Sequence, residues 1–199
     1  RTRIVAIGYA SNSVGTINPI KYITNIAHSV GALVFVDAVQ YAPHGPIDVQ
    51  ELGVDFLVCS AYKFFGPHQG VLWGRYELLE KLKAYKVRPA SHKPPDKFET
   101  GTQNHEAQAG ILGAISYLEW VGNEFGHAYF KEFAHMSGRK LKLHAGMLAI
   151  QKYEEKLSHY LINGLTSMPA ICVRGITNDK QMSERIPTVS FTIKNWKSI

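Results

Sequence analysis

The sequence predicts an α/β fold, in which helices sandwich a mostly parallel β-sheet and a smaller α+β domain begins near the C-terminus. Two observations carry this prediction. Short apolar runs rich in Val, Ile and Phe, without strict polar alternation, are typical of strands buried on both faces of a sheet. The segments that join these runs have helical periodicity or are long enough to cross over, as parallel strands require.

Four apolar runs supply the expected strands, at residues 4–9, 32–37, 55–60 and 71–75. After the first run, Asn18 and Pro19 predict the start of a helix, because Asn caps free backbone N–H groups and Pro fits the first helical position. Gly31 is expected to end that helix. A further helix is expected over the segment YELLEKLKAY, after the fourth run.

The chain beyond the fourth run is predicted to be mainly helical. Residues 86–103 contain three prolines and a glycine and are expected to form a loop. Apolar residues then recur at helical spacing from about Asn104. A longer helical segment runs from about His127 to Leu165, where Gly138 and Gly146 weaken the prediction of continuity.

Two strand-like segments, AICVRG and TVSFTIKNW, follow near the C-terminus. We therefore expect two units. Residues 1–125 form a large domain, and residues 126–199 form a long connecting helix and the start of a small domain.

Composition excludes several classes of protein. Of the 199 residues, 45% are hydrophobic and 19% are charged, which is ordinary for a globular protein and unlike a disordered one. No apolar run approaches the roughly 18 residues of a spanning helix, and the start RTRIVAIGYA lacks a signal-peptide pattern. We expect a soluble, cytoplasmic protein. The net charge of +6 is spread along the chain, so no nucleic-acid interface and no membrane partner is expected.

Metal and disulfide chemistry are not expected. Cys59 and Cys172 lie in apolar runs and are too few for a disulfide scaffold or a four-thiolate site, so we predict two reduced core residues. His105 and Glu106 are followed by Ala109 where a zinc-protease motif needs a second histidine.

Two charged residues come where predicted strands end. Asp37 ends one strand, Gln40 follows three residues later, and Lys63 lies just beyond the strand that ends at Ser60. Charged groups are costly to bury unless they are paired, so an acid and an amine at one sheet edge need an explanation. An Asp37–Lys63 ion pair, or two exposed loop charges, is one explanation. A pyridoxal phosphate site is the other, because it uses a lysine amine for the aldehyde and a carboxylate for the pyridine nitrogen.

Four motifs in register carry a family resemblance: SNSVGTINPI, VFVDAVQ, GVDFLVCSAYKFFGP and FETGTQN. Together they resemble the class V aminotransferase and cysteine desulfurase group of fold type I pyridoxal-phosphate enzymes. The resemblance covers the chain through Gly122 and corresponds to the second part of the large domain and the start of the small one. It implies a pyridoxal-phosphate transferase fold and a piece of a longer enzyme.

The resemblance also implies roles for single residues. Lys63 matches the Schiff-base lysine, Asp37 the partner of the pyridine nitrogen, and Gln40 the residue that hydrogen-bonds the ring hydroxyl oxygen. Asn12 matches a residue near that hydroxyl and the substrate carboxylate, and Ser60 matches a phosphate ligand.

Thr102 and Tyr62 complete the implied cofactor-binding set. Thr102 matches a threonine that reaches the phosphate of the neighbouring subunit's cofactor, which implies a homodimer. A hydroxyl beside a helix start also suits an anion on physical grounds. Tyr62 stands where desulfurases usually carry a histidine, and a phenol donates one hydrogen bond but carries no positive charge at neutral pH.

Other departures leave the function open. Neither Cys59 nor Cys172 matches the nucleophilic cysteine of desulfurases, and the earlier phosphate loop and the ring-stacking aromatic residue have no match in the chain. We expect an enzyme acting on a small amino acid, with cysteine desulfuration as the first hypothesis and transamination or β-elimination as the next. The alternative is a cofactor-free α/β scaffold or interaction fragment without activity of its own.

Overall fold

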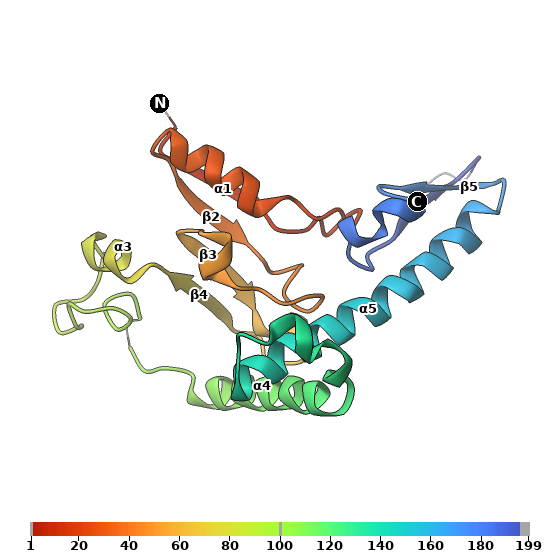
Figure 1. The fold of residues 1–199 in the computed structure, drawn as a ribbon. Coiled ribbons are helices and arrows are strands. Elements are labelled where there is room, and N and C mark those ends of the chain that lie inside the picture. The colour runs from red at the N-terminus through yellow and green to blue at the C-terminus, as the bar shows by residue number, and fades with distance from the viewer. Residues whose placement is uncertain (1, 100, 196–199) are drawn as a thin grey trace.

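The computed structural model describes residues 2–99 and 101–195 (Figure 1). Six strands, five α-helices and three 3₁₀-helices are described, and they follow one another in this order: β1 (Ile4–Gly8), α1 (Ile20–Ser29), β2 (Leu33–Asp37), α2 (Val49–Leu52), β3 (Phe56–Ser60), η1 (Ala61–Phe64), β4 (Gly70–Gly74), α3 (Tyr76–Lys81), α4 (His105–Phe125), η2 (His127–Phe133), α5 (Gly138–Thr166), β5 (Ile171–Arg174), η3 (Asp179–Glu184) and β6 (Ser190–Ile193).

The larger sheet has the strand order β1-β2-β3-β4. The first three strands are parallel and β4 runs antiparallel to β3. Helices flank this sheet in Figure 1, with α1 above it and α4 and the start of α5 below it. The prediction of a mostly parallel sheet flanked by helices is confirmed.

The main core lies between this sheet and α1. Val34 and Val36 of β2 and Leu57 of β3 point toward the helix and pack with its buried Ile20 and Ala27. Burying apolar side chains of this size contributes roughly 1.5 to 3 kcal/mol each to stability. This core fixes the register of the strands, and therefore which residues lie at their carboxyl ends.

The start of α1 differs from the prediction. The helix begins at Ile20, but its first turn has no side-chain cap. The Asn18 side chain instead donates a hydrogen bond to the carbonyl oxygen of Gly8, at 2.7 Å, and so ties the helix entrance to the end of β1. The predicted capping role of Asn18 is therefore wrong, because the amide is used in a tertiary contact.

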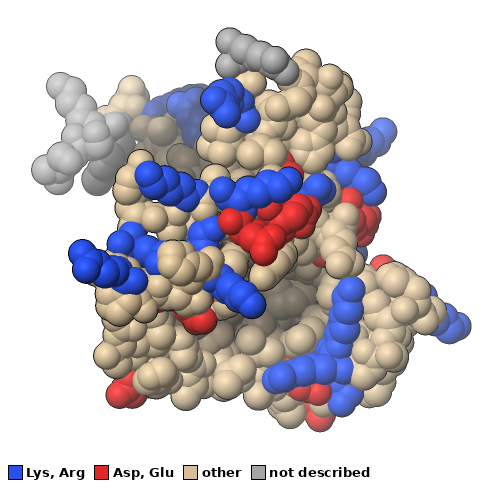
Figure 2. Space-filling model, turned by 90° about the vertical axis from the view of Figure 1, so that its left-hand side faces the viewer, with Lys and Arg blue, Asp and Glu red and all other residues tan. Residues whose placement is uncertain are grey.

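The opposite face of the sheet carries apolar side chains in contact with solvent. Ile4 is 51% exposed and Leu72 is 53% exposed. Ile4 is paired with Leu33, and Leu72 is in register with Asp37 through Val58. Leu33 and Asp37 alternate along β2 with the buried Val34 and Val36, so Ile4 and Leu72 both lie on the opposite face. Figure 2 shows the molecule from one side, hollowed between its upper and lower layers, with Lys and Arg side chains spread over the surface and Asp and Glu among them.

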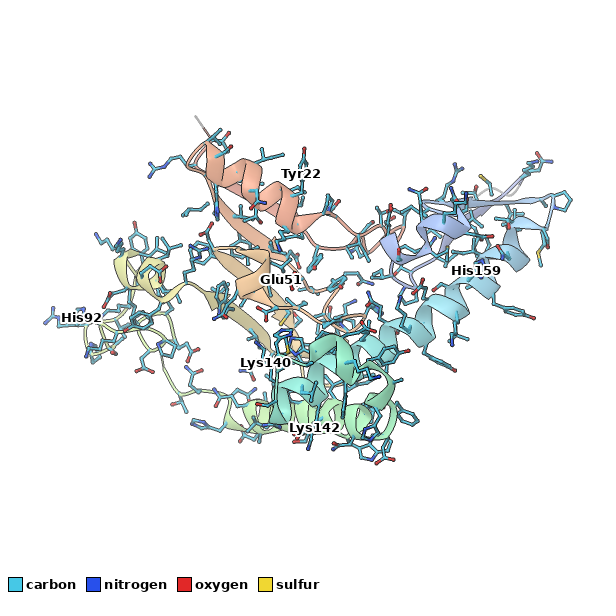
Figure 3. All side chains as sticks on the ribbon, in the orientation of Figure 1. Tyr22, Glu51, His92, Lys140, Lys142 and His159 are labelled. Carbon is cyan, nitrogen blue, oxygen red and sulfur yellow. The ribbon has the colours of Figure 1, made fainter. Side chains whose placement is uncertain are left out.

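The long helical segment is divided. Residues 127–133 form η2, and α5 begins at Gly138, where φ is +57°. Within α5, Gly146 does not interrupt the helix, because it lies where α5 packs directly on the backbone of α4. Figure 3 labels Lys140 and Lys142 near the start of α5, and Lys142 reaches Glu119 of α4 at 3.5 Å. The helical segment expected from about His127 to Leu165 is therefore broken before Gly138, one of the two glycines that weaken its predicted continuity, and it continues unbroken through Gly146.

The C-terminal strands β5 and β6 form an antiparallel pair. The segment before β6 is also hydrogen-bonded to the loop after β1, since Ile186 N donates to Gly15 O at 2.9 Å and Ile17 N donates to Glu184 O at 2.9 Å. The segment before β6 therefore contacts the loop at the carboxyl edge of the large sheet. The division at residue 125 stays a prediction. Among the described residues, no helix is both long and apolar enough to cross a membrane.

Candidate active site

The site lies at the carboxyl edge of the large sheet, where β2 and β3 end side by side. Asp37 is the last residue of β2 and Ser60 the last residue of β3. The strands are parallel, with Asp37 opposite Val58, so both ends meet at one edge. Lys63 follows directly in η1. This is the edge at which open α/β sheets place their ligands.

Lys63 is half-buried and its amine has a defined partner. The Nζ atom donates a hydrogen bond to Gln40 Oε1 at 3.3 Å. It also lies 5.4 Å from the centre of the Tyr62 ring, within the range of a cation–π contact. Lys63 and Gln40, which the motifs predicted to belong to one site, are therefore in direct contact.

Asp37 is exposed and does not pair with the lysine. Its Oδ1 accepts a hydrogen bond from the backbone N–H of Val39, at 2.9 Å, so the carboxylate is held by the turn that follows its own strand. Among the described residues, no contact joins the Asp37 carboxylate to Lys63, and the ion-pair explanation is not borne out. Its Oδ2 atom likewise has no hydrogen-bond partner within that part of the chain.

Gln40 connects the lysine to a distant part of the sequence. Its Oε1 accepts from Lys63 and its Nε2 donates to Thr188 Oγ1 at 3.0 Å. The motifs gave no sign of Thr188, because it lies 148 residues from Gln40. The only sequence signal at that position is the strand-like segment TVSFTI, which indicates structure and not chemistry.

The other predicted residues are less closely joined. Asn12 is exposed in the turn after β1, and Ser60 is half-buried opposite Gly70 of β4. Thr102 is exposed on the bend before α4. No hydrogen bond among residues 2–99 and 101–195 links these three side chains to Lys63 or Gln40.

The Tyr62 ring has a partner that the motifs did not reveal. It stacks on the ring of His68, with centroids 4.8 Å apart and an interplanar angle of 8°. Both residues are exposed on the turn around Lys63. The position before Lys63, where desulfurases usually carry a histidine, is therefore a tyrosine with the imidazole of His68 stacked on its ring.

The two cysteines differ in their surroundings. Cys59 lies on β3, where burial raises the pKa of its thiol and so disfavours the reactive thiolate. Cys172 lies on β5 and is exposed, so its prediction as a core residue is wrong. The structure describes both as free thiols.

Comparison with known proteins decides the family. The model of the family described as aminotransferase class-V matches residues 1–199. The chain belongs to this family.

Several relatives of this class V chain are similar in sequence. The aminotransferase-like protein FGM3 of Gibberella zeae is 37% identical over 202 residues, which cover 100% of this chain and 44% of that protein. A probable cysteine desulfurase of Streptomyces coelicolor is 34% identical over 205 residues, which cover 97% of this chain and 43% of that protein. The chain thus spans less than half the length of these curated relatives.

Solved structures agree with this assignment. The cysteine desulfurase CsdA from Escherichia coli is 26% identical, with a TM-score of 0.70 over 99% of this chain and 45% of that one. The apo cysteine desulfurase from Thermococcus onnurineus NA1 is 26% identical, with a TM-score of 0.75 over 98% of this chain and 45% of that one. The expected fold, a fold type I pyridoxal-phosphate transferase, is confirmed.

The residue types at the sheet edge fit pyridoxal phosphate, the cofactor that membership of this class V family implies. The Lys63 amine is held by a neutral amide oxygen. Asp37 keeps a carboxylate oxygen available for a protonated ring nitrogen, and the Ser60 hydroxyl at the next strand end suits a phosphate. Within the described ranges, no group of three or more His, Cys, Asp or Glu side chains could hold a metal ion.

Proposed function

We propose that this chain carries the reactive lysine of a pyridoxal-phosphate enzyme that acts on a small amino acid. One observation carries the proposal: the Lys63 amine contacts Gln40 at 3.3 Å, at the strand edge where Asp37 also lies. Family membership supports the cofactor, and relatives named cysteine desulfurase support the substrate class. Cysteine desulfuration is our first candidate reaction, followed by transamination and β-elimination.

Lys63 has two tasks in this proposal. Its amine would be the nucleophile that holds the cofactor through its aldehyde, and it would later accept and return the proton of the substrate Cα as general base and acid. When bound, pyridoxal phosphate supplies the electron sink for that proton removal. Gln40 restrains the Lys63 amine at this sheet edge, because its amide oxygen accepts a hydrogen bond from Nζ.

Asp37 has an electrostatic task. Its carboxylate would keep the ring nitrogen protonated through a charge-assisted hydrogen bond, which contributes roughly 1.5 to 3 kcal/mol. The Asp37 turn supports this role, because the Val39 N–H occupies only Oδ1 and orients the group. A carboxylate paired with Lys63 would be unable to act in this way.

The remaining residues are proposed to bind the anionic and polar parts of the ligands. Ser60 and Tyr62 would hold the phosphate, with His68 beside Tyr62, and Asn12 would lie near the substrate carboxylate. Their positions around the lysine turn and the β1 loop support these roles.

We also propose that the enzyme is a homodimer in which Thr102 serves the neighbouring site. Its exposure on the bend before α4 supports this role, because the hydroxyl is free to face a second subunit. Sedimentation of the protein tests the assembly. A protein that stays monomeric at all concentrations contradicts this part of the proposal, and so does an affinity for pyridoxal phosphate that is unchanged in Thr102→Val.

The experiment that tests the function measures cofactor attachment. Pyridoxal phosphate is added to the protein, to Lys63→Ala, to Asp37→Ala and to the control Lys156→Ala, which removes an exposed lysine of α5. We expect a visible absorption band in the wild type and in the control, none in Lys63→Ala, and a shifted, weaker band in Asp37→Ala. A band of equal strength in Lys63→Ala, or no band in any protein, would overturn the proposal and favour a cofactor-free scaffold.

A further inference from the structure

The Gln40 amide is held from both ends in one orientation. An ammonium group only donates hydrogen bonds, so Oε1 of Gln40 must face Lys63. The Nε2 group then faces Thr188, whose hydroxyl oxygen accepts one of its hydrogens at 3.0 Å. A rotation of the amide by 180° would place Nε2 against the ammonium and lose the contact with Lys63, whereas the Thr188 hydroxyl, which can donate or accept, would still bond the amide. Lys63 therefore selects the orientation of the amide, and Thr188 anchors its other end so that Oε1 stays within reach of the lysine.

Thr188 is itself fixed in place by a buried cation. Arg185 is only 6% exposed, and its guanidinium donates to the backbone oxygens of Thr188 and Ile176. Within the described residues no carboxylate pairs with Arg185, so its charge is satisfied by carbonyl groups. Moving Thr188 away would leave the buried guanidinium without a hydrogen-bond acceptor, which is costly. Arg185 therefore holds the backbone at Thr188 in one geometry.

The loop after β1 holds the same segment from the other side. Gly15 has φ of +79°, and a Cβ atom on it would lie 2.7 Å from Thr188 O and 2.8 Å from Ile186 O. The two backbones therefore approach as closely as a residue without a side chain allows. The backbone hydrogen bond from Ile186 N to Gly15 O closes this contact.

We propose that Thr188 is a positioning residue for Lys63, acting through the Gln40 amide. The C-terminal unit thereby completes a site whose other proposed residues all lie between residues 12 and 102. The task of the lysine in this inference rests on the proposed function, whereas the Thr188–Gln40–Lys63 chain of contacts belongs to the protein without any cofactor. Because the Thr188 hydroxyl takes one Nε2 hydrogen, the second one stays available for a bound ligand.

The test uses three variants of the protein. Thr188→Val removes the hydroxyl and keeps the shape, Thr188→Ser restores a hydroxyl, and Thr177→Val is a matched control at an exposed threonine of the same unit. Circular dichroism establishes which variants fold.

The first readout needs no cofactor. The side-chain amide resonance of Gln40, assigned by its loss in Gln40→Leu, is followed by NMR in the wild type and in each variant. We expect Thr188→Val to shift this resonance toward that of a solvent-exposed amide, and we expect Thr188→Ser and Thr177→Val to leave it unchanged. An unchanged resonance in Thr188→Val overturns the inference.

The second readout is the rate at which added pyridoxal phosphate becomes fixed to Lys63 by borohydride. We expect this rate to fall about tenfold in Thr188→Val, as loss of one hydrogen bond that orients a charged group would give, and to recover in Thr188→Ser. If Thr188→Val does not fold, Thr188→Ser decides: a loss in Thr188→Ser as large as in Gln40→Leu contradicts the inference. If the wild type fixes no cofactor, the proposed function fails, and the Gln40 resonance still decides the role of Thr188.

Discussion

Gly146 of α5 lies directly against Gly122 of α4, so that a Cβ atom on Gly146 would be only 2.8 Å from the backbone nitrogen of Gly122. The reverse contact is tighter still, because a Cβ on Gly122 would overlap the carbonyl group of Lys142. The two long helices therefore cross with their backbones in contact, and no other residue type fits at either position.

Alanine at this crossing is expected to destabilise the protein. Because the overlapping atoms belong to the backbone, Gly122→Ala should lower the free energy of unfolding by about 3 kcal/mol, the upper range for overpacking. Urea denaturation measures this change. Gly164→Ala in α5 is the matched control, since nothing lies within 4 Å of its Cβ position. It should be neutral or stabilising by up to about 1 kcal/mol, and equal effects of the two substitutions would contradict the proposed close contact.

A buried carboxylate at the opposite edge of the sheet gives a second prediction. Asp55 is 2% exposed, and its Oδ2 accepts hydrogen bonds from Val34 N at 2.7 Å and from His28 Nε2 at 2.8 Å. Asp55→Ala leaves the Val34 N–H buried without this partner and should cost about 3 kcal/mol of stability. The midpoint of thermal unfolding measures this loss, with Asp96→Ala in an exposed loop as the control. A decrease of similar size in both variants would show that burial of Asp55 does not account for the loss.

The close approach of the loop after β1 gives a third prediction. Gly15→Ala combines an unfavourable positive φ with a clash against Thr188 O, whereas Gly138→Ala has a positive φ of +57° and nothing within 4 Å of the added Cβ. The left-handed conformation alone costs about 1 to 2 kcal/mol for a residue with a side chain. The Gly15 substitution should exceed that cost in chemical denaturation and should also displace the Gln40 resonance. If both substitutions cost the same, the clash with Thr188 is absent.

Acid dependence is predicted at Asp48, which caps α2 and contacts Lys140 of α5 at 3.2 Å. Burial raises the pKa of this carboxyl, but hydrogen bonds from Glu51 N, Lys140 and Gln50 N outweigh it and bring the pKa below the ordinary 3.8. A lowered pKa in the folded state stabilises the protein above the unfolded-state pKa, and this stabilisation is lost as the pH falls through the folded-state value.

The variant Asp48→Asn keeps the capping oxygen and removes the charge. It should lower stability by up to about 1 kcal/mol at about pH 6 and by a negligible amount at about pH 2, when measured by urea denaturation. A difference that stays constant between the two pH values would show that the charge of Asp48 contributes nothing.

Much of the fold follows from local sequence patterns. The strand ends at Asp37 and Ser60 are predicted by apolar runs, and the start of α4 after Asn104 is predicted by apolar residues at helical spacing. In the structure the Asn104 side chain caps this helix by accepting from Ala107 N at 3.0 Å. The capping prediction failed at Asn18 because a tertiary acceptor, Gly8 O, took the side chain. Gly146 weakens the helix prediction because glycine is a poor helix former, whereas the structure shows that glycine is needed there for the close contact with Gly122 of α4.

The same distinction applies to the site. Gln40 and Lys63 are predicted together because each follows a strand, and adjacent parallel strands end at one edge. Thr188 was not predicted, since its contact with Gln40 depends on how the C-terminal unit folds back across 148 residues. The sequence allows two explanations for Asp37 and Lys63, and the structure shows that the lysine turns toward the Gln40 amide.

The account depends most directly on which amine captures the cofactor. The protein is treated with pyridoxal phosphate, reduced with borohydride, digested, and its labelled peptides are identified by mass. We predict one cofactor per chain on the peptide that contains Lys63, with exposed amines such as Lys83 and Lys156 unlabelled at the same cofactor concentration. Label spread evenly over the exposed lysines, with none enriched at Lys63, would contradict the account.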